Sequence, residues 1–125
     1  MKGTILYFFI IGLLSFSCSS SKNNNLNCNL KKITFNIKQF DERGLMGDEK
    51  MAIDFEFCLP DNPNALQAIK EIDSSIKPLH GKGRTKCAEN HIIMIGNSYN
   101  KDIKNILCKL SQLDYITEIN QVFWE

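Results

Sequence analysis

The sequence predicts an α+β domain, a two-layer sandwich in which a mostly antiparallel sheet carries two helices on one face. Three observations support this class. Some stretches alternate apolar and polar residues with the period of a strand, others repeat apolar residues every three or four positions as in an amphipathic helix, and short polar segments separate them. About 98 residues, from 28 to 125, suffice for one hydrophobic core and are too few for two.

The first expected strand covers residues 33–40, because Ile33, Phe35 and Ile37 alternate with polar residues. A polar loop with two glycines follows it. The clearest alternation lies at residues 51–59. Its apolar members are Met51, Ile53, Phe55, Phe57 and Leu59. One face of this strand is therefore expected in the core, and the other meets solvent or a partner.

The first helix is expected to begin at Pro63, with Asp61 or Asn62 as its cap, and to end before Pro78. Apolar residues recur along it at helical spacing: Leu66, Ile69, Ile72 and Ile76. A loop rich in glycine and basic residues follows at 80–84.

Residues 84–88 and 91–96 are expected to form a hairpin, whose second strand is apolar enough to be central in the sheet. The second helix is expected from Lys101 onward. Its apolar stripe consists of Ile103, Ile106, Leu107, Leu110 and Leu113. A last strand is expected at 115–124.

From residue 51 onward the predicted order is strand, helix, strand, strand, helix, strand. This order resembles the ferredoxin-like α/β plait, with residues 33–40 as an extra N-terminal strand. In that plait the strand at 51–59 has neighbours on both sides. The first strand must then reach the sheet edge past a neighbour, or the topology differs.

An export signal precedes the domain. Lys2 is followed by the apolar run 5–14, and small residues lead to Cys18. The segment Ser15-Phe16-Ser17-Cys18 resembles the lipobox of bacterial lipoprotein precursors, although that family usually has leucine at the first of these positions. The resemblance implies that residues 1–17 are a signal peptide and that Cys18 becomes the lipidated N-terminus.

Two alternatives stay open: an ordinary secreted protein cut near Ser17, and an uncleaved anchor. An anchor needs about 20 apolar residues, and the run is shorter. Lipidation implies a location in the cell envelope, on the periplasmic side of a membrane. Ser19 favours the outer membrane, because some lipoproteins carry aspartate there as an inner-membrane signal. Residues 19–25 are polar and low in complexity, so residues 18–27 are expected to be a disordered, lipid-anchored tether ahead of the domain at 28–125.

The charge of the exported chain excludes some partners. Residues 1–17 contain Lys2 and no acidic residue, which leaves 14 basic and 14 acidic residues. A neutral chain lacks the surplus of Lys and Arg that binding to nucleic acid requires. The expected membrane contact is therefore the lipid, and no cofactor is indicated.

Four cysteines remain besides the one in the lipobox: Cys28, Cys58, Cys87 and Cys108. In an oxidising compartment they can form two disulfides in any of three pairings, or some can be buried thiols. No CxxC spacing occurs, so the sequence indicates neither a redox pair nor a zinc knuckle.

Two functions follow as hypotheses. Since no catalytic motif stands out, the first is a non-enzymatic protein-binding module at the membrane, such as an immunity protein, an inhibitor or an accessory subunit. Its candidate partner contacts are Lys82, Arg84, Lys86 and Trp124. Trp124 either seals the core or, if exposed, forms a hot spot. The alternative is a thiol- or metal-handling periplasmic protein, whose candidate residues are Cys58, Cys87 and His91.

Overall fold

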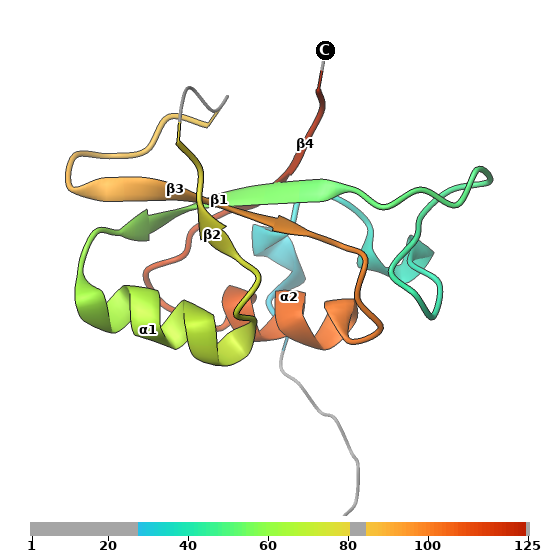
Figure 1. The fold of residues 1–125 in the computed structure, drawn as a ribbon, viewed down its shortest axis with the longest axis horizontal. Coiled ribbons are helices and arrows are strands. Elements are labelled where there is room, and N and C mark those ends of the chain that lie inside the picture. Colours follow the sequence, from blue (N-terminus) through green and yellow to red (C-terminus); the bar gives the residue numbers. More distant parts are fainter. Residues whose placement is uncertain (1–27, 81–84, 125) are drawn as a thin grey trace, which may run out of the picture.

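The computed structural model describes residues 28–80 and 85–124, which include four strands, two α-helices and two short 3-10 turns. The strands and α-helices are β1 (Asp54–Pro60), α1 (Pro63–Ile72), β2 (Lys77–Pro78), β3 (His91–Asn97), α2 (Ile103–Ser111) and β4 (Ile119–Val122). The sheet has the order β2-β3-β1-β4, and each neighbouring pair is antiparallel. Both helices lie on one side of it (Figure 1). The predicted α+β two-layer sandwich is confirmed, and β1 has a neighbour on each side.

The alternation in β1 places one of its faces in the core. Phe55, Phe57 and Leu59 are fully buried, whereas Cys58 on the other face is half-buried. The helices contribute the buried side chains Ala65, Ile69, Ile103, Ile106, Leu107 and Leu110. Removal of these apolar surfaces from water holds the two layers together.

The first helix begins as the sequence predicts and ends earlier. Asn62 caps α1, because its Oδ1 accepts a hydrogen bond from the Ala65 backbone N–H at 2.8 Å. Pro63 occupies the first helical position, where its missing N–H costs nothing. The helix ends at Ile72, and Ile76 is buried in the segment that leads into β2.

The predicted strand at residues 33–40 is wrong. The N-terminal segment forms two 3-10 turns, Leu30–Lys32 and Ile37–Gln39, and contacts the sheet through one parallel bridge between Ile33 and Ile119. Its buried residues are Ile33, Ile37 and Phe40. These lie four and three positions apart, so the alternation in the sequence was not the packing period. The segment reaches the sheet edge at β4 without adding a full strand.

The predicted strand at residues 84–88 is also wrong for its described part. The strand that occupies this place in the sheet is β2, whose Lys77 and Pro78 pair with Ile95 and Met94 of β3. β2 is difficult to predict from the sequence, because the strand has only two residues and one of them is proline, which is confined to sheet edges.

Two contacts hold residues 85–87 over the face of the sheet that is opposite the helices. The backbone N–H and the hydroxyl of Thr85 donate to Glu56 Oε1 at 3.1 and 2.5 Å, and Cys87 forms a disulfide with Cys58. Glu56 is 2% exposed, so these hydrogen bonds replace water at its Oε1, whereas its buried Oε2 has no hydrogen-bond partner among the described residues. The disulfide and these bonds draw the segment onto β1 and away from the predicted hairpin with β3.

The second disulfide ties the N-terminal segment to the helix layer. Cys28 is bonded to Cys108 of α2, with the two Cα atoms 4.5 Å apart. The Ser111 hydroxyl strengthens this junction: it donates to the Cys108 carbonyl at 2.6 Å and accepts from the backbone N–H after Cys28 at 3.0 Å. With Cys58 and Cys87, this is one of the three pairings that the sequence allows.

Candidate functional site

Exposed apolar side chains gather at one end of the sheet, where β1 begins and β4 ends. Met51, Phe123 and Trp124 are 59%, 61% and 65% exposed. They line one hollow of about 430 Å³, which we call the β4-end hollow. Its walls are Met46, Met51, Ala52, Ile53, Asp54, Gln121, Val122, Phe123 and Trp124. The other described hollows have mainly charged or polar walls, so this one is distinguished by its apolar lining.

A tight turn brings the two methionines of the hollow together. The Met46 N–H donates to the Met51 carbonyl at 2.8 Å, and the Met51 N–H donates back to the Met46 carbonyl at 3.1 Å. Gly47 has φ +82°, in the left-handed region where a side chain is disfavoured. The turn therefore presents both methionines beside the start of β1.

Buried Ser98 fixes this loop to the sheet. Its Oγ accepts from the Ile53 N–H at 2.9 Å and donates to the Gly44 carbonyl at 2.7 Å. Gly44 has φ +85°, and a Cβ there would overlap the Ser98 carbonyl oxygen. The close approach explains the glycine, and it makes the loop with Met46 a fixed wall of the hollow.

The Trp124 ring is oriented by a hydrogen bond. Its Nε1–H donates to Asp54 Oδ2 at 2.7 Å, and the other oxygen of this carboxylate accepts from Asn97 Nδ2 at 2.8 Å. The only polar atom of the indole is thus satisfied within the protein, and its apolar faces meet solvent. Of the two alternatives left open for Trp124, the structure has the exposed one.

The walls of the β4-end hollow carry little charge. Asp54 is the only ionisable residue among its walls, and both carboxylate oxygens of Asp54 accept hydrogen bonds. The surface therefore suits an uncharged, apolar partner surface better than an ion or a charged small molecule.

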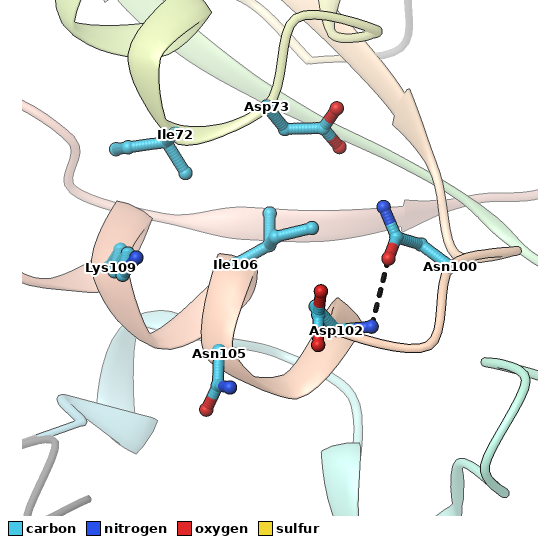
Figure 2. A pocket seen from close by; sticks show the side chains of 7 residues that line it. All are labelled: Ile72, Asp73, Asn100, Asp102, Asn105, Ile106 and Lys109. Atoms are coloured by element: carbon cyan, nitrogen blue, oxygen red, sulfur yellow. Dashed lines mark hydrogen bonds between the residues drawn. The ribbon is translucent and has the colours of Figure 1, made fainter. Parts of the chain in front are cut away.

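A second hollow, of about 330 Å³, lies between the C-terminal end of α1 and α2 (Figure 2). Its walls are Ile72, Asp73, Asn100, Asp102, Asn105, Ile106 and Lys109. The Asp102 N–H donates to Asn100 Oδ1 at 2.8 Å, whereas the buried Asp73 Oδ2 has no hydrogen-bond partner in the part of the chain that the structure describes. Within residues 28–80 and 85–124, no three His, Cys, Asp or Glu residues come together as metal ligands, so we assign no chemistry to this hollow.

The structure describes only some of the predicted site residues. Cys18, Lys82 and Arg84 lie outside the described residues. Lys86 is exposed, but it is not among the walls of the β4-end hollow, whereas Trp124 is. The predicted basic and aromatic contacts are therefore not shown to form one surface. No described helix has both the length and the hydropathy needed to cross a membrane.

The predicted thiol and imidazole residues have partners. Cys58 and Cys87 form a disulfide with Cα atoms 5.5 Å apart. His91 lies at the start of β3, opposite Pro60, and its Nδ1 donates to the Glu89 carbonyl at 2.9 Å. In this arrangement neither sulfur is a free thiol.

Sequence reasoning missed most of the hollow. The sequence pattern places Met51 and Ile53 on the buried face of a strand, although β1 begins only at Asp54 and Met51 is exposed. Phe123 was grouped with the last strand, although β4 ends at Val122. The available signal in the sequence was a run of apolar residues at the start of the strand expected at 51–59 and another at the end of the strand expected at 115–124.

Comparison with protein-family models, curated proteins and solved structures found no match, so the functional argument depends on the geometry of this chain.

Proposed function

We propose that this protein is a membrane-anchored, non-enzymatic protein-binding module, such as an immunity protein, an inhibitor or an accessory subunit. The observation that supports this most is the β4-end hollow, where Met51, Phe123 and Trp124 are exposed together on a rigid frame. Methionine and aromatic residues are enriched at the centres of protein interfaces, where a few of them provide most of the binding energy.

The exposed side chains have enough apolar surface to drive binding. Complete burial of one large apolar side chain contributes roughly 1.5–3 kcal/mol, and the hollow offers three that are more than half exposed. Trp124 is already oriented by Asp54, so little side-chain entropy is lost when a partner covers it. A pre-positioned aromatic beside two methionines is therefore a suitable anchor for a protein surface.

The proposed location follows from the leader. Residues 1–17 would direct export, and acylation of Cys18 would hold the protein at the periplasmic side of a membrane, with the outer membrane favoured. Residues 18–27 would act as a tether that lets the domain search for a partner near the membrane.

The alternative proposal is a thiol- or metal-handling protein that uses Cys58, Cys87 and His91. It requires the Cys58–Cys87 disulfide to open, because a disulfide sulfur is neither a nucleophile nor a strong metal ligand. Intact-mass measurement of the purified protein separates the two proposals. Two free thiols or a bound metal would favour the alternative, and stable disulfides without metal would favour the binding module.

Affinity capture from the native envelope tests the binding module directly. The tagged wild-type protein is compared with Trp124→Ala and with Tyr99→Ala, a matched control because Tyr99 is 66% exposed and lies outside the hollow. We expect one stoichiometric partner with the wild type and the Tyr99 variant, and at least a tenfold loss with the Trp124 variant, which is about 1.4 kcal/mol or more. Recovery of no other protein, or equal recovery with both variants, would refute the proposal.

A further inference from the structure

We infer that the open edge of β4, together with the residues that follow it up to Trp124, binds a second copy of this chain by antiparallel pairing of β4 with β4 of the other copy. The result is one sheet that is continuous through both molecules. The inference goes beyond the proposed function. It concerns the strand edge that carries four walls of the β4-end hollow, and it assigns to that edge a second copy of this chain in place of a different protein.

One edge of β4 lacks a partner strand. β4 stands at the end of the sheet order, and its other edge pairs with β1 (Figure 1). The Ile119 carbonyl accepts from the Thr34 N–H at 3.0 Å, so Ile119 directs its backbone groups away from β1. Directions alternate along an antiparallel strand, so Gln121 directs its N–H and C=O groups the same way. The proposed pairing continues this alternation to Phe123, the residue after the last strand residue, Val122. Within the described chain, these groups of Gln121 and Phe123 form no hydrogen bond.

Residues 119–124, which form this open edge, lack the residues that usually protect an edge strand. Residues 119–124 read Ile-Asn-Gln-Val-Phe-Trp, without charge or proline. Soluble proteins normally protect edge strands with lysine, proline, a bulge or a covering segment. Here the N-terminal segment covers only Ile119, through its bridge with Ile33, and residues 120–124 stay open. A row of unpaired donors and acceptors with apolar side chains is the surface that another extended strand fits.

The open stretch is complementary to itself. A two-fold axis through its middle residue, Val122, pairs Gln121 of each copy with Phe123 of the other, and Asn120 with Trp124. Gln121 and Phe123 then exchange their outward N–H and C=O groups in both directions, so the exposed donors and acceptors of both copies are satisfied. No charged side chain meets a like charge, because the stretch contains none. Two-fold symmetric, isologous interfaces are the commonest in homo-oligomers.

The same axis is compatible with anchoring in one membrane. Paired residues of an antiparallel ladder lie on the same face of a sheet, so the axis runs perpendicular to it and the helices of both copies lie on one side. Cys28 is bonded to Cys108 of α2, so it belongs to the helix layer. Both chains therefore enter their domains from the same side, as two copies tethered to one membrane require.

Disulfide trapping in the cell envelope tests the inference on the full chain. Val122 faces Val122 across the axis as a non-hydrogen-bonded pair, with Cα atoms about 4.5 Å apart, which is within the range of a disulfide. Val122→Cys should give, after mild oxidation, a band of twice the chain mass on a non-reducing gel. Asn120→Cys and Tyr99→Cys carry the same additional thiol and serve as controls, because neither residue faces its own copy. We expect about tenfold more dimer for the Val122 variant than for either control. Absence of its dimer, or equal dimer in all three variants, would overturn the inference.

A second substitution, made in the Val122→Cys background, tests the backbone pairing itself. Gln121→Pro, added to Val122→Cys, removes an N–H that points away from β1, and proline is tolerated on a strand edge of this kind. Gln121→Ala keeps the N–H and is the matched control. The proline should abolish the trapped dimer, and the alanine should retain it, with far-UV circular dichroism unchanged in both. A dimer that survives the proline would count against strand pairing.

The outcomes separate this inference from the proposed function. A trapped Val122 dimer together with capture of only further copies would support self-association and refute binding to a different protein. If the Val122 variant forms no trapped dimer and a different protein is captured in a way that depends on Trp124, the proposed function is supported and self-association is refuted.

Discussion

Ser98 offers a sharp test of how the loop beside the β4-end hollow is held. The change Ser98→Ala removes one hydroxyl and almost no volume. The Ile53 N–H then loses its acceptor, and the Gly44 carbonyl loses a donor that lies 2.7 Å away. Ser98 is 0% exposed, so water has no direct access to the side chain's position. Two backbone groups are therefore left without partners in a poorly solvated place.

The expected loss of stability follows from those two groups. A buried polar group that loses its partner costs about 1–3 kcal/mol. Ile53 is half-buried, so relaxation can restore part of the solvation of its N–H. We expect Ser98→Ala to lower the free energy of unfolding by about 2–4 kcal/mol, which is a large share of the roughly 5–15 kcal/mol of a typical domain.

Urea unfolding followed by far-UV circular dichroism measures this loss. Ser74→Ala is the control, because Ser74 is an exposed serine in the turn after α1, and a surface change of this kind alters stability by no more than about 0.5 kcal/mol. Equal unfolding midpoints for the two variants, at equal slopes, would show that the Ser98 hydroxyl does not hold the loop. The reasoning about the fixed wall of the hollow would then be wrong.

Two further predictions concern the N-terminal half. Replacing both Cys28 and Cys108 by alanine should lower the free energy of unfolding by about 4–5 kcal/mol in urea, because the disulfide closes a loop with a sequence separation of 80; a loss below about 1 kcal/mol would mean that the bond is absent or without effect. The pKa of Asp41 is held below its ordinary value of 3.8, first by the Leu45 backbone N–H and then by the Arg43 backbone N–H. A lowered folded-state pKa stabilises the fold above pH 3.8 and ceases to do so as the pH falls through the folded value. The stability difference between wild type and Asp41→Asn should therefore be largest above pH 3.8 and vanish in stronger acid, and a difference that grows in acid would contradict this assignment.

The parts of the fold that the sequence predicted correctly are those whose local and tertiary preferences agree. β1 alternates because one face is buried, and α1 carries both a cap and an apolar stripe, so pattern and packing point to the same structure. The strand prediction for residues 33–40 failed because Ile33, Phe35 and Ile37 alternate as in a strand. The residues that are buried there, Ile33, Ile37 and Phe40, lie four and three positions apart. Local pattern cannot choose between two periods when the partner surface is unknown.

The candidate site was less accessible to sequence reasoning than the fold. Trp124 was identified as a contact if exposed, but its exposure depends on where β4 ends and on the carboxylate of Asp54, far away along the chain. The methionines of the hollow lie in and after a loop whose position is set by Ser98. These contacts join residues that are distant in sequence, and no local spacing encodes them.

By itself, the sequence determined the class of fold, the helix stripes, the interior place of β1 and the even number of cysteines available for pairing, since each depends on period or composition. Only the tertiary structure decided which cysteines pair, which residues form β2, and that Met51, Phe123 and Trp124 share one exposed surface. The physical reason is that burial and pairing are properties of two surfaces at once. A chain segment carries the preference for being covered, and the rest of the fold determines what covers it.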